Sequence, residues 1–512
     1  MKNILLSLFL FLTTLYLTAQ DPSIEWQKSL GGSGYDFGHS TQQTIDGGYI
    51  VVGRSNSTDG NVTGNHGDYD FWVVKQSNTG SIIWQKSLGG TWMEWARSIQ
   101  QTTDGGYIVA GLSYSNDGDV TGNNGSSDFW VVNLDSLGAI NWQKSLGGTG
   151  NDFAYSIQQT TDDGYIVAGS SSSTDGDVTS NHGFNDYWVV KLDSIGIIVW
   201  QKTLGGSSWD VATSIQQTTD GGYIVTGFSS SSNGDITSYH GGRDYWVVKL
   251  DSTGTTVWQK SLGGSGSDEA RSIQQTTDGG YIIAGNSNST DGNLTGNHGN
   301  YDCWVVKLSN VGVVEWQKSL GGSGDDGGNS IQQSTDGGYV VAGYTNSTDG
   351  DIIGNNGGYD YWVVKLSSIG NIIWQKALGG FGSDAATSIQ QTSDGGYIVA
   401  GDSYSTNGDV TGNNGIVDYW VVKLSPSVGV SEITAFNEFN VYPSPTSSQI
   451  TLKVNANLVG AVYTIYDNMG KVVMSGKINT ENTVIELDNL SNGIYLFTIG
   501  ENSQQTFKVI KN

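Results

Sequence analysis

The sequence is poor in cysteine, proline and positive charge. Its 512 residues include 1 Cys and 4 Pro, and 23 Lys and Arg stand against 49 Asp and Glu, a formal net charge of −26. A single cysteine excludes an internal disulfide framework. The excess of negative charge repels phosphate backbones, so we expect no nucleic-acid partner. Beyond residue 19 no apolar run approaches the roughly 20 residues of a membrane-spanning helix, so we expect none in the mature chain.

Signatures of several enzyme classes are also missing. The chain has no H-E-x-x-H motif, no phosphate-binding loop and no nucleophile elbow between a strand and a helix. Adjacent acids such as Asp325 and Asp326 give no separation across a sugar ring, which glycoside hydrolysis requires. We therefore predict that the protein is not an enzyme and has no catalytic residues.

Glycine and tryptophan are abundant, and they follow a repeat. The chain has 75 Gly and 17 Trp. One tryptophan series lies in the motif W-Q-K and a second in D-x-W-V-V, and successive members of each series are 58 residues apart, as Trp26 and Trp84 are. One unit is thus written seven times between residues 24 and 424. The two series are Trp26, Trp84, Trp142, Trp200, Trp258, Trp316 and Trp374, and Trp72, Trp130, Trp188, Trp246, Trp304, Trp362 and Trp420.

Each repeat predicts four β-strands. In the first complete copy, stretches rich in β-branched and aromatic residues cover 39–45, 49–55, 70–76 and 81–88, and an Asp-Gly-Gly turn joins the first two. One such sheet cannot bury both faces alone, so neighbouring sheets must stack. The predicted fold is all-β, a seven-bladed β-propeller followed by a small C-terminal β-sandwich.

The two ends of the repeat region are complementary. It begins with a lone fourth strand at 24–30 and ends after a third strand at 418–424. A β-solenoid, the alternative, needs polar caps at both ends. In a closed ring the first strand instead completes the last sheet and removes its open edge. We therefore predict that the N-terminal strand closes the last blade by pairing with 418–424.

Three further regions lie outside the repeats. Residues 1–19 combine Lys2, an apolar run and Ala19, the pattern of a cleaved secretory signal peptide. Residues 425–438 have few aromatic side chains and are interpreted as a linker. The predicted domains are therefore a signal peptide at 1–19, a propeller at 20–424, a linker at 425–438 and a separate unit at 439–512.

The C-terminal unit carries a family resemblance. Its stretches F-N-V-Y-P-S-P-T, Y-T-I-Y-D-N-M-G-K-V-V, L-D-N-L-S-N-G-I-Y-L-F-T-I and K-V-I-K resemble the type A C-terminal sorting domain of the type IX secretion system of Bacteroidetes, with Ser444 where the family usually has Asn. The resemblance implies that 439–512 is recognised by the translocon and sorting machinery of that system. It also implies a protein that is secreted or left on the outer cell surface. The repeats in turn look like propeller repeats found in cargo of the same system.

The long connection between the second and third strands is the candidate metal site. In three copies it reads D-G-D, which places two carboxylates on either side of a glycine and suits the hard oxygen ligands of Ca²⁺. Asp-Gly beside Asn and Thr is equally what a plain turn needs, and several copies carry Asn for one Asp. Calcium is therefore a hypothesis beside turn chemistry, and no other cofactor is expected. The candidate ligands are Asp117, Asp119, Asp175, Asp177, Asp349 and Asp351.

Three other recurring positions are interpreted as structural. Four of the five histidines alternate with Asn at one position before Gly, which predicts positive φ there, since His and Asn are enriched in that region. The Asp before each second-series Trp and the Lys of each W-Q-K predict a repeated ion pair. Cys303 stands where other copies have Phe or Tyr, which predicts an apolar strand residue.

The connection from each fourth strand to the next first strand varies most between copies. The non-repeating Trp92, Trp95 and Trp209 lie there, on the rim that also carries the second-to-third connections of a propeller. Variable aromatic side chains on a rigid scaffold suit a carbohydrate or protein ligand, whereas the alternative is that they pack over the rim or fill the channel. The sequence thus predicts a secreted binding or adhesion module that uses these three tryptophans. A structural surface protein and a polysaccharide-active enzyme are the alternatives.

Overall fold

The computed structural model describes residues 21–426, 439–442, 446–454, 458–467, 471–499 and 506–511. They fall into two compact units, one over residues 18–428 and one that includes residues 429–512. The expected signal peptide and most of the expected linker lie outside the described residues. None of the described residues forms a helix long and apolar enough to cross a bilayer.

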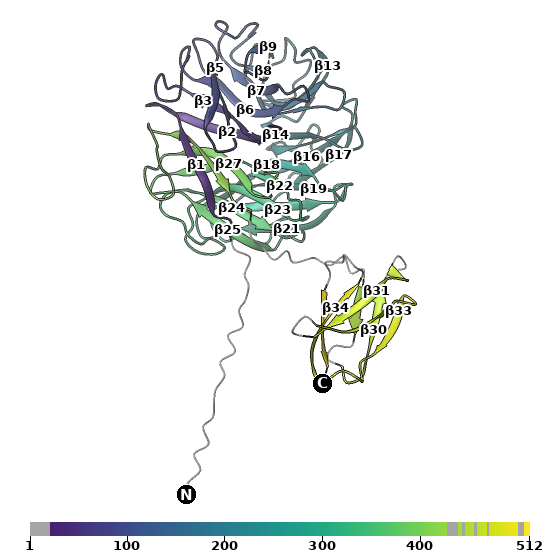
Figure 1. The fold of residues 1–512 in the computed structure, drawn as a ribbon. Coiled ribbons are helices and arrows are strands. Elements are labelled where there is room, and N and C mark those ends of the chain that lie inside the picture. Colours follow the sequence, from purple (N-terminus) through teal and green to yellow (C-terminus); the bar gives the residue numbers. More distant parts are fainter. Residues whose placement is uncertain are drawn as a thin grey trace. The chain divides into compact units, whose positions relative to one another are not determined.

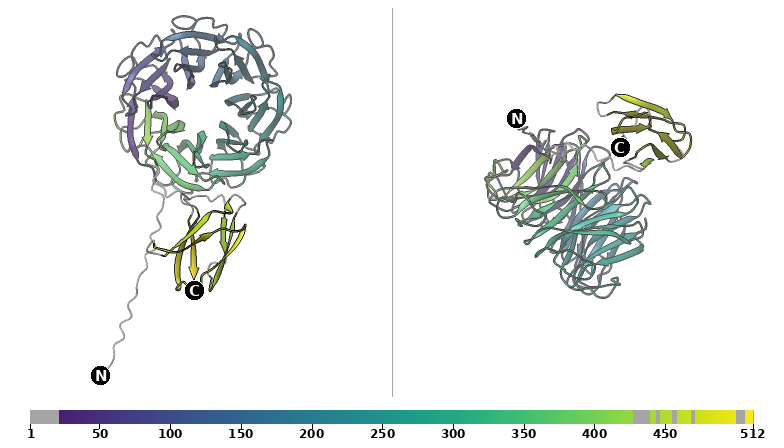
Figure 2. Two further views of the ribbon diagram at one scale, coloured as in Figure 1. Left: turned by 45° about the vertical axis from the view of Figure 1, so that its right-hand side comes forward. Right: turned by 90° about the horizontal axis from the view of Figure 1, so that it is seen from below.

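The larger unit is a ring of seven antiparallel sheets of four strands each (Figures 1 and 2). The first complete blade consists of β2 (Asp36–Gln43), β3 (Tyr49–Ser55), β4 (Asp70–Gln76) and β5 (Ile82–Leu88), hydrogen-bonded in that order. The next five blades repeat this order as β6 (Glu94–Gln101), β7 (Tyr107–Ser113), β8 (Asp128–Leu134), β9 (Ile140–Leu146), β10 (Asp152–Gln159), β11 (Tyr165–Ser171), β12 (Asp186–Leu192), β13 (Ile198–Leu204), β14 (Asp210–Gln217), β15 (Tyr223–Ser229), β16 (Asp244–Leu250), β17 (Thr256–Leu262), β18 (Asp268–Gln275), β19 (Tyr281–Ser287), β20 (Asp302–Leu308), β21 (Val314–Leu320), β22 (Asp326–Gln333), β23 (Tyr339–Thr345), β24 (Asp360–Leu366) and β25 (Ile372–Leu378).

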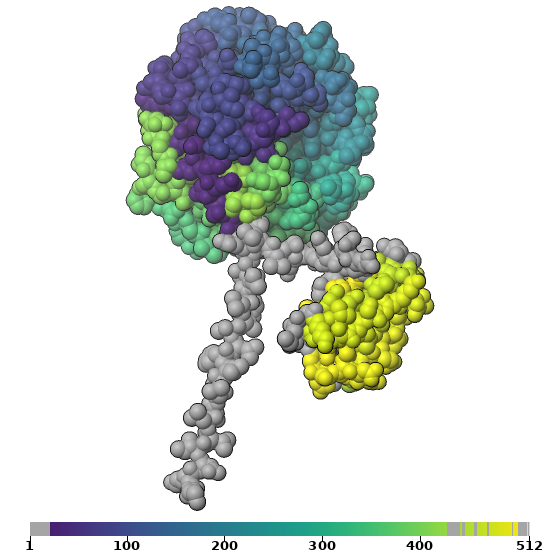
Figure 3. Space-filling view, in the orientation of Figure 1, coloured from purple at the N-terminus to yellow at the C-terminus, as the bar shows by residue number. Residues whose placement is uncertain are grey.

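The ring closes as the sequence predicts. In the seventh blade β26 (Asp384–Gln391), β27 (Tyr397–Ser403) and β28 (Asp418–Leu424) come from the end of the repeat region, and β1 (Ile24–Leu30) is the fourth strand. β1 runs antiparallel to β28, so the earliest part of the ring lies against its last strands (Figure 3). The Trp420 indole also donates a hydrogen bond of 2.7 Å to the Gln27 side chain, the partner that every second-series Trp has in its own blade.

Glutamine and serine side chains of the first strands link every blade to the next. The motif S-I-Q-Q recurs at this position, with Thr41 for Ile in the first copy. The first Gln accepts from a backbone N–H of the next blade, as Gln42 does from Gln101 at 2.7 Å, and the bond from Gln43 to Gln390 at 2.6 Å completes the circle. Seven equivalent bonds surround the axis, made by Gln42, Gln100, Gln158, Gln216, Gln274, Gln332 and Gln390.

The core lies between neighbouring blades. Each second-series Trp is at most 1 % exposed, and all but Trp362 pack on an aromatic ring of the previous blade, as Trp130 does on Phe71 with ring centroids 4.5 Å apart. The first-series tryptophans are half-buried, except for the buried Trp374, and contact a tyrosine edge-on, as Trp84 contacts Tyr107. Burial of such large aromatic surfaces stabilises each interface.

Cys303 is buried in the position of those partner rings, as predicted, and forms no disulfide. Burial raises the pKa of its thiol well above the ordinary value. The thiol therefore behaves as a small apolar group in the interface.

The predicted ion pair between the Asp before Trp and the Lys of W-Q-K is wrong. The lysine that pairs lies instead in the third strand and contacts the aspartate of the Asp-Gly-Gly turn, as Lys75 contacts Asp46 at 2.9 Å. Hydrogen bonds from Thr44, Lys75 and Gly48 outweigh burial and lower the pKa of Asp46 to about 2. The W-Q-K lysines lie on the outermost strands, and the aspartates before Trp are buried elsewhere.

The C-terminal unit is a small β-sandwich. One sheet contains β29 (Phe439–Tyr442), β30 (Gln449–Val454) and β33 (Asn482–Glu486), and the other contains β31 (Val462–Tyr466), β32 (Val472–Lys477), β34 (Gly493–Ile499) and β35 (Thr506–Lys511). Alternate residues of both sheets share one core, in which Tyr463 and Phe497 stack at 5.4 Å. This confirms the predicted second fold.

Candidate functional site

Two sets of connections meet on one rim of the propeller. The connection from β5 to β6 is held by the long connection that follows β7. The Trp92 backbone N–H donates to Ser115 Oγ at 2.9 Å, and the Thr91 N–H donates to Asp117 Oδ1 at 2.8 Å. Equivalent bonds recur in every blade. The variable connections therefore stand on a fixed hydrogen-bonded base.

The six predicted calcium ligands take part in that base. Each first Asp of D-G-D accepts a backbone N–H in the way Asp117 does, and each second Asp accepts a glycine N–H, as Asp119 accepts that of Gly89 at 3.2 Å. Asn233 accepts the same bond from Ser207 at 2.8 Å, so one side-chain oxygen meets the requirement. Among the described residues no group of three or more His, Cys, Asp or Glu is arranged to hold a metal ion. Calcium binding stays a prediction. The remaining predicted ligands make the same contacts, through Asp175, Asp177, Asp349 and Asp351.

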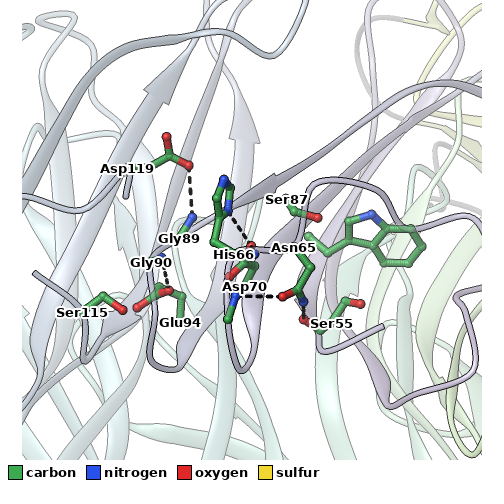
Figure 4. A network of polar contacts seen from close by, with 12 residues as sticks. Ser55, Asn65, His66, Asp70, Ser87, Gly89, Gly90, Glu94, Ser115 and Asp119 are labelled. Carbon is green, nitrogen blue, oxygen red and sulfur yellow. Dashed lines mark hydrogen bonds and ion pairs between the residues drawn. The ribbon is translucent and has the colours of Figure 1, made fainter. Parts of the chain in front are cut away.

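The recurring histidine position is set by a hydrogen bond and not by backbone conformation. Within the described chain the one non-glycine residue with positive φ is Asp163, so the prediction of positive φ at the His/Asn position is wrong. The His66 backbone N–H donates to Asp70 Oδ2 at 2.9 Å, and its Nδ1 lies 2.8 Å from the same oxygen (Figure 4). Asn124 makes the corresponding backbone bond to Asp128. Any residue with a backbone N–H allows this bond, and a side-chain nitrogen adds a second contact in His66 and in Asn414, whose Nδ2 donates to Asp418 Oδ2 at 3.2 Å.

Each blade interface contains a pair of buried carboxyl groups beside a glycine. Asp70 of β4 and Glu94 of β6 form one such pair (Figure 4). Asp70 Oδ1 and Glu94 Oε2 both lie within 2.6 Å of the point that a Cβ of Gly89 would occupy, so these oxygens are at most 5.2 Å apart. Asp70 Oδ1 is buried and has no hydrogen-bond partner in the described chain. A side chain at Gly89 would collide with both carboxyl groups.

Burial favours the neutral form of these carboxyl groups. It raises the pKa of Glu94 and of Asp128 to about 7, and the pKa of Asp360 and of Asp418 to about 6, and the second carboxyl of each pair adds to the effect. In blades with histidine, the bonds from His66 to Asp70 counteract part of that rise in pKa. A neutral carboxyl in a pair removes the repulsion between its two members.

The structure places the three predicted tryptophans in three settings. Trp92 is 64 % exposed and borders a rim pocket of about 360 Å³ with Asp68, Met93 and Tyr114. Trp209 is 51 % exposed and stacks on Phe184 with ring centroids 6.4 Å apart, two blades further on. Trp95 does not lie in a connection but in β6, where it is half-buried.

Trp95 is the centre of a cluster that the sequence did not reveal. The guanidinium carbons of Arg54 and Arg97 each lie 3.5 Å from the centre of its ring. The Trp95 indole donates a hydrogen bond to His39 Nε2. Phe37 lies 4.6 Å from the Arg54 guanidinium carbon. A cationic cluster thus lies on β2, β3 and β6 of a strongly acidic protein.

The positive charges of this cluster repel each other. Because both are 3.5 Å from one point, the guanidinium carbons of Arg54 and Arg97 are at most 7.0 Å apart. At an effective dielectric constant of 20, that separation corresponds to a repulsion of about 2 kcal/mol. Neither arginine has a carboxylate within ion-pair distance in the described chain, although Asp402 interacts with Arg54 electrostatically. Cation–π contact with Trp95 offsets part of this cost.

Residues 440–512 match the family described as the secretion system C-terminal sorting domain. This confirms the resemblance read from the C-terminal motifs. The regulatory protein FlaEY of Caulobacter vibrioides is 23 % identical over 416 residues, which are 73 % of this chain and 43 % of that protein. The chain therefore spans less than half the length of that relative.

Several solved structures are similar in fold. The WD40 domain of Pan2 from Neurospora crassa is 10 % identical with a TM-score of 0.41, over 77 % of this chain and 95 % of that chain. BamB from Moraxella catarrhalis is 14 % identical with a TM-score of 0.37, over 78 % and 99 %. PorZ of Porphyromonas gingivalis, a bacterial surface component of the type IX secretion system, is 11 % identical with a TM-score of 0.38, over 90 % and 58 %. The match over residues 440–512 and the ring of seven sheets together describe an exported protein that joins a seven-bladed β-propeller to a secretion system C-terminal sorting domain.

Proposed function

We propose that this protein, once exported, acts outside the cell or on its outer surface as a binding or adhesion module. The sorting domain supports the location, because it directs its cargo to a secretion system. The propeller supports the activity, because a rigid scaffold with variable loops is a common arrangement for recognition. The proposal assigns the protein no catalytic activity.

The observation that carries this proposal is the exposure of large aromatic side chains on one variable rim. Trp92, Trp209 and Phe381 are 64 %, 51 % and 78 % exposed, and all three lie in fourth-to-first connections. The blades beneath them are nearly identical, so these side chains are not required by the repeat itself. Exposed aromatic rings supply a large apolar contact area, which suits the apolar face of a sugar or a protein surface.

The pocket beside Trp92 is the best-formed part of this rim. Its volume of about 360 Å³ is near the lower end of the range of about 300–1,000 Å³ that small-molecule sites occupy. Trp92 and Tyr114 supply rings, and Asp68 supplies a hydrogen-bond acceptor. A neutral sugar unit has the matching combination of apolar face and hydroxyl donors.

The test is binding of the purified mature chain to an array of neutral and charged polysaccharides, with and without Ca²⁺. We expect a specific signal that is lost in the double variant Trp92→Ala and Trp209→Ala. A suitable control is Leu137→Ala, because Leu137 is 70 % exposed and lies in the turn before an outermost strand. Retained binding in the double variant, or equal loss in the control, would argue against the rim as the binding surface.

The two alternative functions give different results in the same assays. A purely structural surface protein would show no specific ligand in either condition. A polysaccharide-active enzyme would release reducing sugar from one member of the panel, and this release would require residues of one blade interface only. The proposal predicts a specific binding signal without release of reducing sugar.

A further inference from the structure

Each innermost strand contains a β-bulge, and the bulged residue is the variable one. In all seven blades the pairing register shifts just before the serine of S-I-Q-Q, as it does between Ala96 and Ser98. The extra residue is Arg97 in this blade, and a bulge turns such a side chain away from its regular direction. The four residues that follow are almost constant, whereas the bulged residue differs between most blades. The seven bulged residues are His39, Arg97, Tyr155, Thr213, Arg271, Asn329 and Thr387.

The bulged residues lie next to the central channel. The residues two and three positions after them line a cavity of about 260 Å³ on the axis, to which Ile99 and Gln100 contribute. Neighbouring bulged residues approach one another around this axis, since the Arg97 guanidinium carbon lies 5.3 Å from the centre of the Tyr155 ring. Variation in an otherwise constant strand is thus concentrated two residues before the first residue that lines the axial cavity.

Two arginines, Arg97 at the bulge of β6 and Arg54 of β3, have unused hydrogen-bond donors. The Arg97 guanidinium makes only cation–π contacts within the described chain, and Nε of both Arg54 and Arg97 is buried without a partner. Burial lowers the pKa of Arg97 to about 10, and the charges of Arg54 and Arg271 contribute, so the group is still cationic at neutral pH. Arg243 and Arg271 differ, because both bind Glu269. Within the part of the chain that the structure describes, Arg54 and Arg97 are therefore the two arginines without an ion-pair partner.

His39 adds a neutral donor to the same place. Burial, with the charges of Arg97 and Arg54, holds the pKa of His39 well below its usual value. Its Nε2 accepts a hydrogen bond from the Trp95 indole N–H, so the single imidazole proton is on Nδ1. The phenol of Tyr155 is the polar group of the next blade.

Arg54 and Arg97 both lie against the ring of Trp95. We propose that these two arginines form a site beside the channel that binds the oxyanion group of a small ligand. His39 and Tyr155 complete this site. The group is a carboxylate, a sulfate or a phosphate, because these accept paired N–H donors of guanidinium groups. An anion there would supply the missing counter-charge and occupy donors that the protein leaves unused.

The acidic surroundings confine anion binding to this site. The propeller region carries 42 Asp and Glu against 17 Lys and Arg, so anions are repelled from most of the molecule. Asp402, whose charge acts on Arg54, forms no ion pair with it in the described chain, and burial raises the pKa of Asp402 to about 7. The lining of the axial cavity of about 260 Å³ begins two residues beyond each bulge, so the oxyanion site lies beside this cavity and is not part of its lining. The site is independent of the aromatic rim in the proposed function.

The experiment is calorimetric titration of the full mature chain with D-glucuronate, glucose 6-sulfate, glucose 6-phosphate, inorganic sulfate and inorganic phosphate. Glucose is the neutral comparison, and chloride keeps the ionic strength constant. We expect binding of at least one oxyanion and none of glucose. The sugar and inorganic arms distinguish recognition of the anion alone from recognition of an acidic sugar.

Matched variants test the residues. Arg54→Met and Arg97→Met, which keep much of the side-chain volume, should each weaken binding at least tenfold. Arg243→Met removes the same charge from a surface arginine paired with Glu269 and should leave binding within about twofold. Arg97→Lys keeps the charge without the planar fork, and should bind more weakly than the native chain but better than Arg97→Met.

Three results would overturn the proposal: no probe binds, glucose binds as well as glucuronate, or Arg243→Met loses as much affinity as Arg97→Met. If a Met variant fails to fold, Arg54→Lys and Arg97→Lys decide, since unchanged affinity in both would exclude guanidinium recognition. Trp92→Ala with Trp209→Ala should not affect this titration. Failure of the rim proposal and failure of this one are therefore distinguishable.

Discussion

Replacing Asp128 by asparagine should stabilise the propeller at alkaline pH and do little at acid pH. Asp128 Oδ1 is buried without a partner in the described chain and faces Asp152 Oδ2 across Gly147. Both oxygens lie within 2.6 Å of the point that a glycine Cβ would occupy, so they are at most 5.2 Å apart. An asparagine keeps the bond from the Asn124 N–H through its oxygen. Its amide group would face Asp152 as a donor in place of a carboxyl that must hold a proton.

The magnitude follows from the pKa of Asp128. Burial raises it from 3.8 to about 7, a difference of about 3 units, which corresponds to about 4 kcal/mol at most. Because the native state holds its proton more tightly than the unfolded chain, the stabilisation is complete below pH 4. It is lost as the pH rises through 7. For a cooperative unit spanning Ile24–Leu424, 4 kcal/mol corresponds to a shift in the melting temperature of about 5 °C.

The assay is thermal and urea unfolding of native and variant chains from pH 4 to pH 8. We expect Asp128→Asn to melt up to about 5 °C higher than the native chain at pH 8, with the difference vanishing near pH 4. Asp117→Asn is the control, because Asp117 is an exposed carboxylate of the same blade and other blades carry Asn there. A variant that is destabilised at pH 8, or a difference that does not change with pH, would refute the assignment of a neutral carboxyl to Asp128.

Three further predictions concern the ring. Deleting residues 21–30 removes β1 and exposes the edge of β28, so we expect aggregation on size-exclusion chromatography and a lower melting temperature; a monomer of native stability would contradict closure by β1. Cys303→Tyr restores the ring that Tyr361 and Tyr419 supply in other interfaces, so the free energy of unfolding measured in urea should rise by about 1 kcal/mol. A destabilised variant would show that the smaller side chain is required there. If the D-G-D loops bind calcium, excess chelator should lower the melting temperature, and an Asp349→Asn variant should respond less; an unchanged melting temperature would end that hypothesis.

The fold was predictable because the repeat is nearly invariant. Constant Trp positions and a lone strand at one end imply the number of sheets and the closing pair, and β1 and β28 confirm both. The wrong predictions concerned contacts between residues whose partners lie outside the local pattern. The lysine partner of Asp46 is in the third strand, 29 residues away, and nothing in W-V-V-K distinguishes it from the lysine of W-Q-K.

The candidate site was predictable only in part. The three tryptophans stood out because they break the repeat, and two of them are exposed on the rim. The repeat is also broken at Arg54, Arg97 and His39. These residues are brought together by the bulge in each first strand and by the curvature of the ring. A comparison restricted to the residue before S-I-Q-Q would have found the variable position, though not the side chains that gather around Trp95.

Both ends of the propeller chain leave the ring at one blade. The Ser425 backbone N–H donates to the Ser23 carbonyl at 2.9 Å, and Ser425 follows β28 directly. A pull on the C-terminal side therefore acts on β28, which has ladders to β27 and β1 on its two sides. A pull on the N-terminal side acts on β1, which has a ladder on one side. When the molecule is held through its C-terminal unit, tension therefore reaches the ring through β28, which is hydrogen-bonded on both sides. β1, which is paired on one side and would separate more easily, carries no load.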